Sequence, residues 1–188
     1  MDNKKELPKR KSTRLKSFDY STSGGYFVTI CVNDRKQILS EIIKTNCTGK
    51  DKTIDSEVGE GLAPPEYSVK LKPCGEIAEE QLLLIEKRFP DVSVEDYVIM
   101  PDHIHIVLFL HKKAGGASPS PTLDDVVCAF KSLTSRICKQ RYGIEKIFQR
   151  SSAEHIIRNK EDYETRRNYI HENPMRWYYK YLDRNKYS

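Results

Sequence analysis

Residues 92–110 read Val-Ser-Val-Glu-Asp-Tyr-Val-Ile-Met-Pro-Asp-His-Ile-His-Ile-Val-Leu-Phe-Leu, and this stretch decides the fold class. It holds two apolar, β-branched runs, 92–100 and 104–110, which meet at Pro101-Asp102. Such runs around a short polar connection predict an antiparallel pair of strands joined by a tight turn. On the amino-terminal side, residues 26–32 (Tyr-Phe-Val-Thr-Ile-Cys-Val) predict a further strand.

The segments between these strands carry helical spacing. Residues 75–89 and 123–142 place apolar residues three and four apart, and a last helix is expected to begin at Asn159 or Lys160 and to end at Pro174. Shorter strands are expected near 37–43 and 67–71, and a short apolar piece at 145–149. The order predicts an α+β fold: a ferredoxin-like sandwich with a central antiparallel β-sheet and helices on one face, plus a C-terminal helix carrying a tyrosine.

Charge is concentrated at the two ends of the chain. The net charge is +5 over 188 residues, yet residues 1–20 hold seven Lys/Arg against three acids, and residues 166–188 hold six against two. We therefore divide the chain into a basic N-terminal arm, 1–20, and one domain, 21–188. Basic ends favour an anionic partner, most commonly nucleic acid, although basic tails that only aid solubility remain an alternative.

Several protein classes do not fit this composition. No stretch approaches the ~20 apolar residues of a membrane span, and the first 20 residues are too polar for a signal peptide. The five cysteines are odd in number and have no CxxC spacing, which argues against a disulfide framework or a zinc ribbon. We expect a cytoplasmic protein without a membrane partner.

The most informative pair is His103 and His105. On a strand, side chains two apart share a face, so the two imidazoles should stand side by side while Ile104 and Ile106 enter the core. Two neutral imidazoles on one face make half of a metal site. The alternative is a pair of polar residues on a solvated face. By the same alternation, Asp102 is expected to point to the opposite face.

A second informative pair lies in the last predicted helix. Tyr169 and Asn173 are four residues apart and so share a helix face, one turn from each other. A tyrosine phenol next to an asparagine amide on a helix is rarely buried for packing alone. The alternative is that one of 11 tyrosines happens to precede an Asn-Pro helix end.

Taken together, Met100-Pro101-Asp102-His103-Ile104-His105-Ile106-Val107 and Tyr169-Ile170-His171-Glu172-Asn173-Pro174 resemble the single-tyrosine HUH transposases, and specifically the REP-associated tyrosine transposase branch. The resemblance covers about residues 26–177. It implies that Tyr169 is a nucleophile and that His103, His105 and Asn173 hold a divalent cation, Mg²⁺ or Mn²⁺. An asparagine at the third ligand position is typical of the REP-associated branch.

The resemblance also implies a function. It predicts a DNA transposase-type transesterase that cleaves and rejoins single-stranded or hairpin DNA, with a palindromic repeat as the expected substrate, through a 5′-phosphotyrosine. The protein would work near the nucleoid as a monomer or homodimer. Two alternatives remain open at this point: a non-catalytic nucleic-acid-binding module on the same fold, and a metal-dependent phosphodiesterase.

Candidate DNA-binding residues are basic side chains in the arm, on a helix and around the nucleophile. They are Lys9, Arg10, Lys11, Arg14, Lys131, Arg150, Arg158, Arg166 and Arg167. The aromatic run 177–181 either stacks on bases or, as is more common, packs back onto the sheet.

Overall fold

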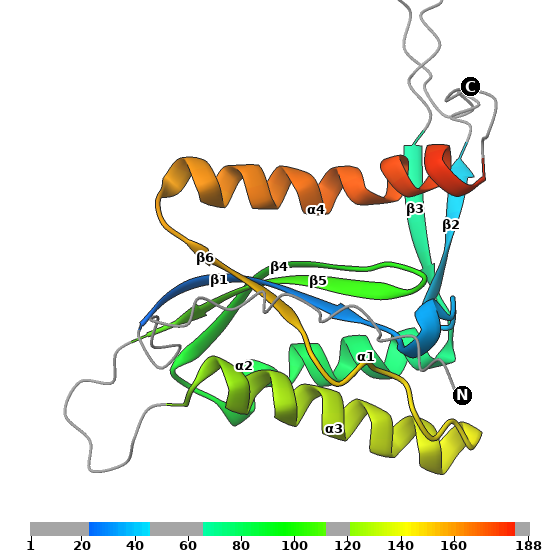
Figure 1. Ribbon diagram of the computed structural model, residues 1–188, viewed down its shortest axis with the longest axis horizontal. Helices are drawn as coiled ribbons and strands as arrows, with labels where there is room; N and C mark the ends of the chain where they lie inside the picture. Colours follow the sequence, from blue (N-terminus) through cyan, green and yellow to red (C-terminus); the bar gives the residue numbers. More distant parts are fainter. Residues whose placement is uncertain (1–22, 46–65, 112–120, 183–188) are drawn as a thin grey trace, which may run out of the picture.

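The computed structural model describes residues 23–45, 66–111 and 121–182, and the basic arm lies outside these ranges. Four strands form an antiparallel sheet in the order β4-β5-β1-β6. They are β1 (Gly24–Cys31), β4 (Val92–Ile99), β5 (His103–Leu110) and β6 (Ala153–Ile157). With the helices that connect them, this order is that of the ferredoxin-like sandwich, as predicted (Figure 1).

Helices cover both faces of the sheet, but unequally. Three of them lie together on one face: α1 (Pro73–Leu83), the short α2 (Ile85–Arg88) and α3 (Leu123–Tyr142). The long helix α4 (Lys160–Tyr181) crosses the other face alone (Figure 1). The chain also forms a hairpin of β2 (Ser40–Thr45) and β3 (Glu66–Leu71), which stands beside the C-terminal half of α4, and a one-turn helix η1 (Asn33–Arg35).

Strand alternation divides the core into two parts. In β1, Tyr26, Val28 and Ile30 pack into the larger core under α1 and α3, whereas Phe27 joins a smaller one under α4. In β5, Ile104 and Ile106 enter the larger core, as predicted. The histidine face of β5 is therefore the face that α4 crosses.

Local signals explain most helix ends. Thr122 caps α3 through a capping box with Asp125, and Gly143 ends it in the left-handed conformation at φ 68°. The segment predicted as one helix over 75–89 instead starts at Pro73 and is interrupted at Leu84 between α1 and α2. Proline is favoured in the first helical turn, where its missing N–H would have no partner.

The predicted end of the last helix at Pro174 is wrong, because α4 continues through Pro174 to Tyr181. A proline inside a helix removes one hydrogen bond and costs about 3 kcal/mol. Here Ile170, Pro174 and Trp177 are buried on one side of α4, so their packing against the sheet offsets that cost. Within the three described ranges, no helix combines the length and apolar character that crossing a bilayer requires.

Candidate active site

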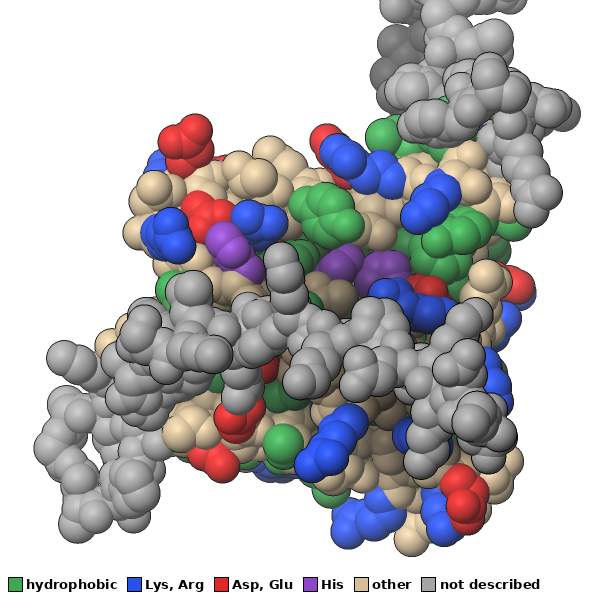
Figure 2. All heavy atoms as spheres, viewed as in Figure 1, with side chains coloured by type: hydrophobic (Ala, Val, Ile, Leu, Met, Phe, Trp, Pro, Cys, Tyr) green, Lys and Arg blue, Asp and Glu red, His purple; other side chains and the backbone are tan. Residues whose placement is uncertain are grey.

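A cleft of about 660 Å³ lies between α4 and the sheet. In Figure 2, histidine side chains gather in the depression beneath α4, with basic side chains nearby. The lining of the cleft comes from β1, from η1 and the segment after it, from the turn before β5, from β5 and from α4: Thr29, Arg35, Gln37, Asp102, His103, His105, Tyr169, Asn173, Arg176, Trp177, Lys180 and Tyr181. All four residues predicted as nucleophile and metal ligands line this one cleft.

His103 and His105 stand side by side at the start of β5, with ring centroids 4.6 Å apart. Their exposed fractions are only 9% and 5%, because α4 covers this face of the sheet. The alternative of a solvated polar face is therefore wrong. Buried imidazoles need polar partners, and each of these two rings has one.

The partner of His103 is Asp102. The Asp102 carboxylate is hydrogen-bonded to Nδ1 of His103, and its other oxygen lies 3.5 Å from the Arg35 guanidinium. The prediction that Asp102 points to the opposite face is wrong, because β5 begins at His103 and strand alternation does not extend into the preceding turn. A carboxylate on Nδ1 fixes the ring orientation and leaves Nε2 to act as a ligand.

The partner of His105 is Thr29 on the adjacent strand β1. The Thr29 hydroxyl lies 2.9 Å from Nδ1, and the two residues are directly paired in the sheet. Burial, and then the neighbouring His103 and Arg35, lower the pKa of His105 to about 3. The imidazole is therefore neutral at physiological pH, which is the form that binds a metal.

Tyr169 and Asn173 face the histidines from α4. Asn173 is 6% exposed and Tyr169 38% exposed, so the amide is enclosed while the phenol stays open to solvent. The Tyr169 ring meets His105 edge-on with centroids 5.2 Å apart, and the Arg176 guanidinium lies 5.7 Å from the ring centre. The phenol is thus beside the imidazole pair at an accessible edge of the cleft.

The donor set of this cleft suits a divalent cation that shares its ligands with a phosphate. Among the described residues there is no cluster of three His, Cys, Asp or Glu side chains suited to a metal, since the third candidate here is the amide of Asn173. Imidazole nitrogens and an amide oxygen add no negative charge. Oxygen atoms of an anionic substrate would complete such a site, as they do for Mg²⁺ and Mn²⁺ in phosphoryl-transfer enzymes.

The structure separates the predicted DNA-binding residues. Lys131 and Arg150 lie away from the cleft, where the Lys131 ammonium donates to the Arg150 carbonyl at 2.8 Å and burial lowers the Lys131 pKa. Arg167 pairs with Asp96 of β4 at 3.5 Å. Lys9, Arg10, Lys11 and Arg14 fall outside the described residues.

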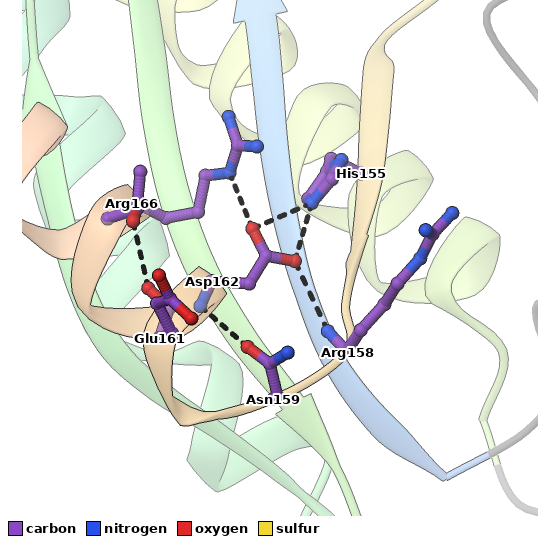
Figure 3. A network of polar contacts seen from close by, with 7 residues as sticks. His155, Arg158, Asn159, Glu161, Asp162 and Arg166 are labelled. Carbon is purple, nitrogen blue, oxygen red and sulfur yellow. Dashed lines mark hydrogen bonds and ion pairs between the residues drawn. The ribbon is translucent and has the colours of Figure 1, made fainter.

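Arg166 belongs to a polar network around Asp162, at the start of α4 (Figure 3). The Asp162 carboxylate accepts hydrogen bonds from Nε2 of His155 at 2.8 Å, from Nε of Arg166 at 3.2 Å and from the backbone N–H of Arg158 at 3.2 Å. Burial alone would raise the pKa of Asp162, but these hydrogen bonds outweigh it and hold the pKa below its ordinary value. The Arg166 guanidinium also lies 5.7 Å from the Phe27 ring centre, close to the cleft.

Several cleft residues were not found by sequence reasoning. Thr29, Arg35 and Gln37 line the cleft, and Phe27 stacks on His105 with centroids 5.0 Å apart. Phe27 and Thr29 are two residues apart in β1, so strand alternation places them on the same face, but it does not say which strand lies beside them. Their pairing with β5 depends on the sheet order, for which the sequence holds no local signal. Glu154 pairs with Val28 and so lies on the α3 side of the sheet, away from the histidine face.

The aromatic run near the end of α4 packs back onto the fold. Trp177 is 7% exposed and belongs to the smaller core, and Tyr178 and Tyr179 contact Tyr67 of β3. Tyr181 remains at the cleft, where it stacks against Trp177 with ring centroids 4.3 Å apart. Packing is therefore the main role of this run in the described part of the chain.

No protein-family model matches the chain. An uncharacterised protein of Haemophilus influenzae is 25% identical over 183 residues, which cover 89% of each chain. A transposase-like crystal structure from Deinococcus radiodurans aligns over 86% of this chain and 96% of its own, at 15% identity, but its TM-score of 0.40 is too low to support an argument.

A stronger structural match is a REP-associated tyrosine transposase bound to a REP hairpin. It aligns with 87% of this chain and 74% of its own, with a TM-score of 0.54 and 18% identity. This structural alignment establishes a common fold. The four-stranded antiparallel sheet with helices on both faces is thus the fold of a REP-associated tyrosine transposase.

Proposed function

We propose that this chain is a metal-dependent DNA transposase of the single-tyrosine HUH type, which cleaves and rejoins single-stranded or hairpin DNA. The observation that carries the proposal is the convergence of Tyr169, the pair His103 and His105, and Asn173 on one cleft. These residues come from two elements far apart in the sequence, β5 and α4. A phenol, two imidazoles and an amide in one basic cleft suit phosphoryl transfer better than they suit packing.

The residues that would hold the cation are His103, His105 and Asn173. Bound there, a divalent cation would polarise a non-bridging oxygen of the scissile phosphate and stabilise the charge of the transition state. Asp102 and Thr29 would hold the two imidazoles in place, each through Nδ1.

Tyr169 would act as the nucleophile. Its phenolic oxygen forms a bond to phosphorus while the bond from phosphorus to the 3′ oxygen breaks. The phenol loses a proton and the departing 3′ oxygen gains one, which leaves a 5′-phosphotyrosine and a free 3′-OH. Attack by another 3′-OH reverses the step, so rejoining consumes no nucleoside triphosphate.

Cations around the cleft would position the DNA strand. Arg35, Arg176 and Lys180 line it, and Arg166 lies near its Phe27 side. These cationic side chains would contact phosphates of the DNA. Phosphate contacts position a strand without recognising its sequence. That a protein of the same fold is bound to a REP hairpin supports hairpin DNA as the substrate class.

The proposal is tested by trapping the covalent intermediate. The full chain is incubated with Mn²⁺ and a 3′-labelled hairpin carrying single-stranded flanks, taken from a palindrome beside the gene, and is then denatured in sodium dodecyl sulfate. The wild type should give a denaturant-stable protein–DNA adduct that EDTA abolishes. Tyr169→Phe should give none, whereas Tyr142→Phe, an exposed tyrosine on α3, should behave as wild type.

The same assay separates the alternatives. His103→Ala and His105→Ala should lose the adduct but keep hairpin affinity within a few fold, because phosphate contacts carry most of the affinity. An adduct formed by Tyr169→Phe would refute the nucleophile assignment. Cleavage to free 5′-phosphate without an adduct would indicate a phosphodiesterase, and binding without cleavage a non-catalytic module.

A further inference from the structure

A second cavity lies on the α4 side of the sheet, at the opposite end of α4 from the C-terminal part of the cleft. Its volume is about 470 Å³, within the ~300–1,000 Å³ range of small-ligand sites. It is lined by Glu95, Phe109, His111, Ile157, Arg158, Asn159, Lys160 and Tyr163. None of these residues lines the cleft that holds Tyr169.

The cavity has an aromatic wall. Phe109 of β5 and Tyr163 of α4 meet edge-on with ring centroids 5.9 Å apart, and both are only partly buried. Phe109 lies beside Gly25, where a Cβ atom would be 2.9 Å from the ring. Because Gly25 has no side chain, the Phe109 ring can lie close to the sheet, and the cavity stays open.

The rim of the cavity carries cations that are not neutralised by the nearby acids. Asp162 is engaged by His155, by Arg166 and by the backbone of Arg158. In Figure 3 the Arg158 side chain extends away from Asp162. Across the described ranges, no side-chain hydrogen bond or ion pair is formed by the Arg158 guanidinium or the Lys160 ammonium, and both residues are exposed.

The rim of the cavity opposite these two cations carries a small group of hydrogen-bonded polar side chains. The Ser93 hydroxyl donates to the Glu95 carboxylate at 3.0 Å and lies 3.0 Å from Nε2 of His111. This group presents a hydrogen-bond acceptor across the cavity from the two cations. The aromatic wall suits the flat base of a nucleotide, and the two cations suit its phosphates. The hydrogen-bond acceptor suits the amino or imino groups of the base.

We propose that this cavity binds an unstacked nucleobase of the single-stranded DNA that flanks the cleavage position. The inference rests on DNA being the substrate of the proposed function. Tyr163 and Tyr169 are six residues apart on one helix, about 9 Å along its axis, which a short run of nucleotides can span. The base stacks on Tyr163 and Phe109, while Arg158 and Lys160 contact the adjoining phosphates.

The test compares two tails on one hairpin. The full chain is titrated, in EDTA to prevent cleavage, with a fluorescent hairpin carrying either an oligo(dT) tail or an abasic tail of equal length. The abasic tail keeps every phosphate and removes the bases. Wild type should prefer the thymine tail, and Tyr163→Ala should reduce that preference about tenfold, since one base loses its stacking partner. Tyr163→Phe, which keeps the ring, should behave as wild type.

The cations are tested by salt dependence. Arg158→Ala/Lys160→Ala should reduce the slope of log affinity against log salt by about 1.4, the value for two single-strand phosphate contacts. Lys87→Ala/Arg141→Ala removes two exposed cations from α2 and α3 on the other side of the sheet and should leave the slope unchanged.

Two results would overturn the inference. One is a thymine preference that Tyr163→Ala leaves intact. The other is a Tyr163→Ala variant with a lower melting temperature and unchanged DNA affinity, which would mean that the chain itself fills the cavity. Neither depends on adduct formation, so failure of the cleavage mechanism is distinguished from failure of this site.

Discussion

At the scale of single residues, the site depends on what holds the two imidazoles. Each ring is fixed through Nδ1, His103 by Asp102 and His105 by Thr29, so Nε2 is the nitrogen left for a ligand. Partners of this kind set ring orientation as well as tautomer. In the proposed site, these two partners would therefore affect cation binding without touching the substrate.

Thr29→Val should weaken metal-dependent adduct formation about tenfold, because removing an orienting partner of a ligand histidine costs ~10–100-fold in activity or metal affinity. Valine keeps the shape of threonine and removes only the hydroxyl that contacts His105. The measurement is the initial rate of adduct formation at several Mn²⁺ concentrations. Thr29→Ser retains a hydroxyl and should stay near wild type, whereas equal losses in both variants would show that packing, not the hydrogen bond, is responsible.

At the scale of elements, α4 decides where the tyrosine lies. Its first turn is attached to β6 through Asp162 and His155. Its middle contacts β4, where Asp96 pairs with Arg167 and lies 2.9 Å from Nε2 of His171. Its buried side holds it against the sheet beyond Pro174. A helix attached at several points can present Tyr169 and Asn173 at a constant height above the histidines.

Asp162→Asn should lower the free energy of unfolding at pH 7 by about 1 kcal/mol, since hydrogen bonds to a charged carboxylate are lost. The pKa of Asp162 is depressed in the folded state, so its contribution is fully present above its ordinary value near 3.8 and is lost as pH falls through the lower folded-state pKa. Urea unfolding of both proteins between pH 7 and pH 3 should show the two stabilities converging at the acid end.

A matched control for this comparison is Glu80→Gln. Glu80 is exposed in α1, and its side chain forms no hydrogen bond or ion pair within residues 23–45, 66–111 and 121–182. This variant should match wild type throughout the pH range. A stability gap of Asp162→Asn that persists unchanged at pH 3 would contradict the assigned charge state.

At the scale of the whole molecule, the structure shows where part of the positive charge of the two chain ends lies. Of the basic residues in 166–188, Arg176 and Lys180 line the cleft, and Arg166 and Arg167 lie on the turns before Tyr169. The equally basic residues 1–20 lie outside the described ranges, so their role rests on charge. Both ends would add to the attraction of a polyanion.

Deletion of residues 1–20 should weaken hairpin binding and flatten its salt dependence, because the segment carries seven Lys/Arg against three acids. Affinity measured over a range of salt concentrations gives the slope. Residues 46–65 form a control of the same length with two lysines and four acids, and replacing them with a short turn should not flatten the slope. An unchanged slope after removal of 1–20 would assign those charges to solubility.

Much of the fold was predictable because its signals are local. The strand alternation that sends Ile104 and Ile106 inward also places His103 and His105 together, and the Thr122 cap and Gly143 mark the limits of α3. Prediction failed where a local rule competes with packing. Pro174 would end an isolated helix, but burial against the sheet lets α4 continue, and Asp102 escapes strand alternation because it lies in a turn.

Sequence patterns alone predict the α+β class, the shared face of the two histidines and the one-turn spacing of Tyr169 and Asn173, since all three follow from backbone periods of two and 3.6 residues. That these two pairs meet follows only from the three-dimensional packing. Their meeting depends on α4 crossing the histidine face of the sheet, and on β1 pairing with β5 so that Thr29 reaches His105. Those contacts join residues scores of positions apart, and they are set by the packing of whole layers, for which no short stretch of sequence carries a signal.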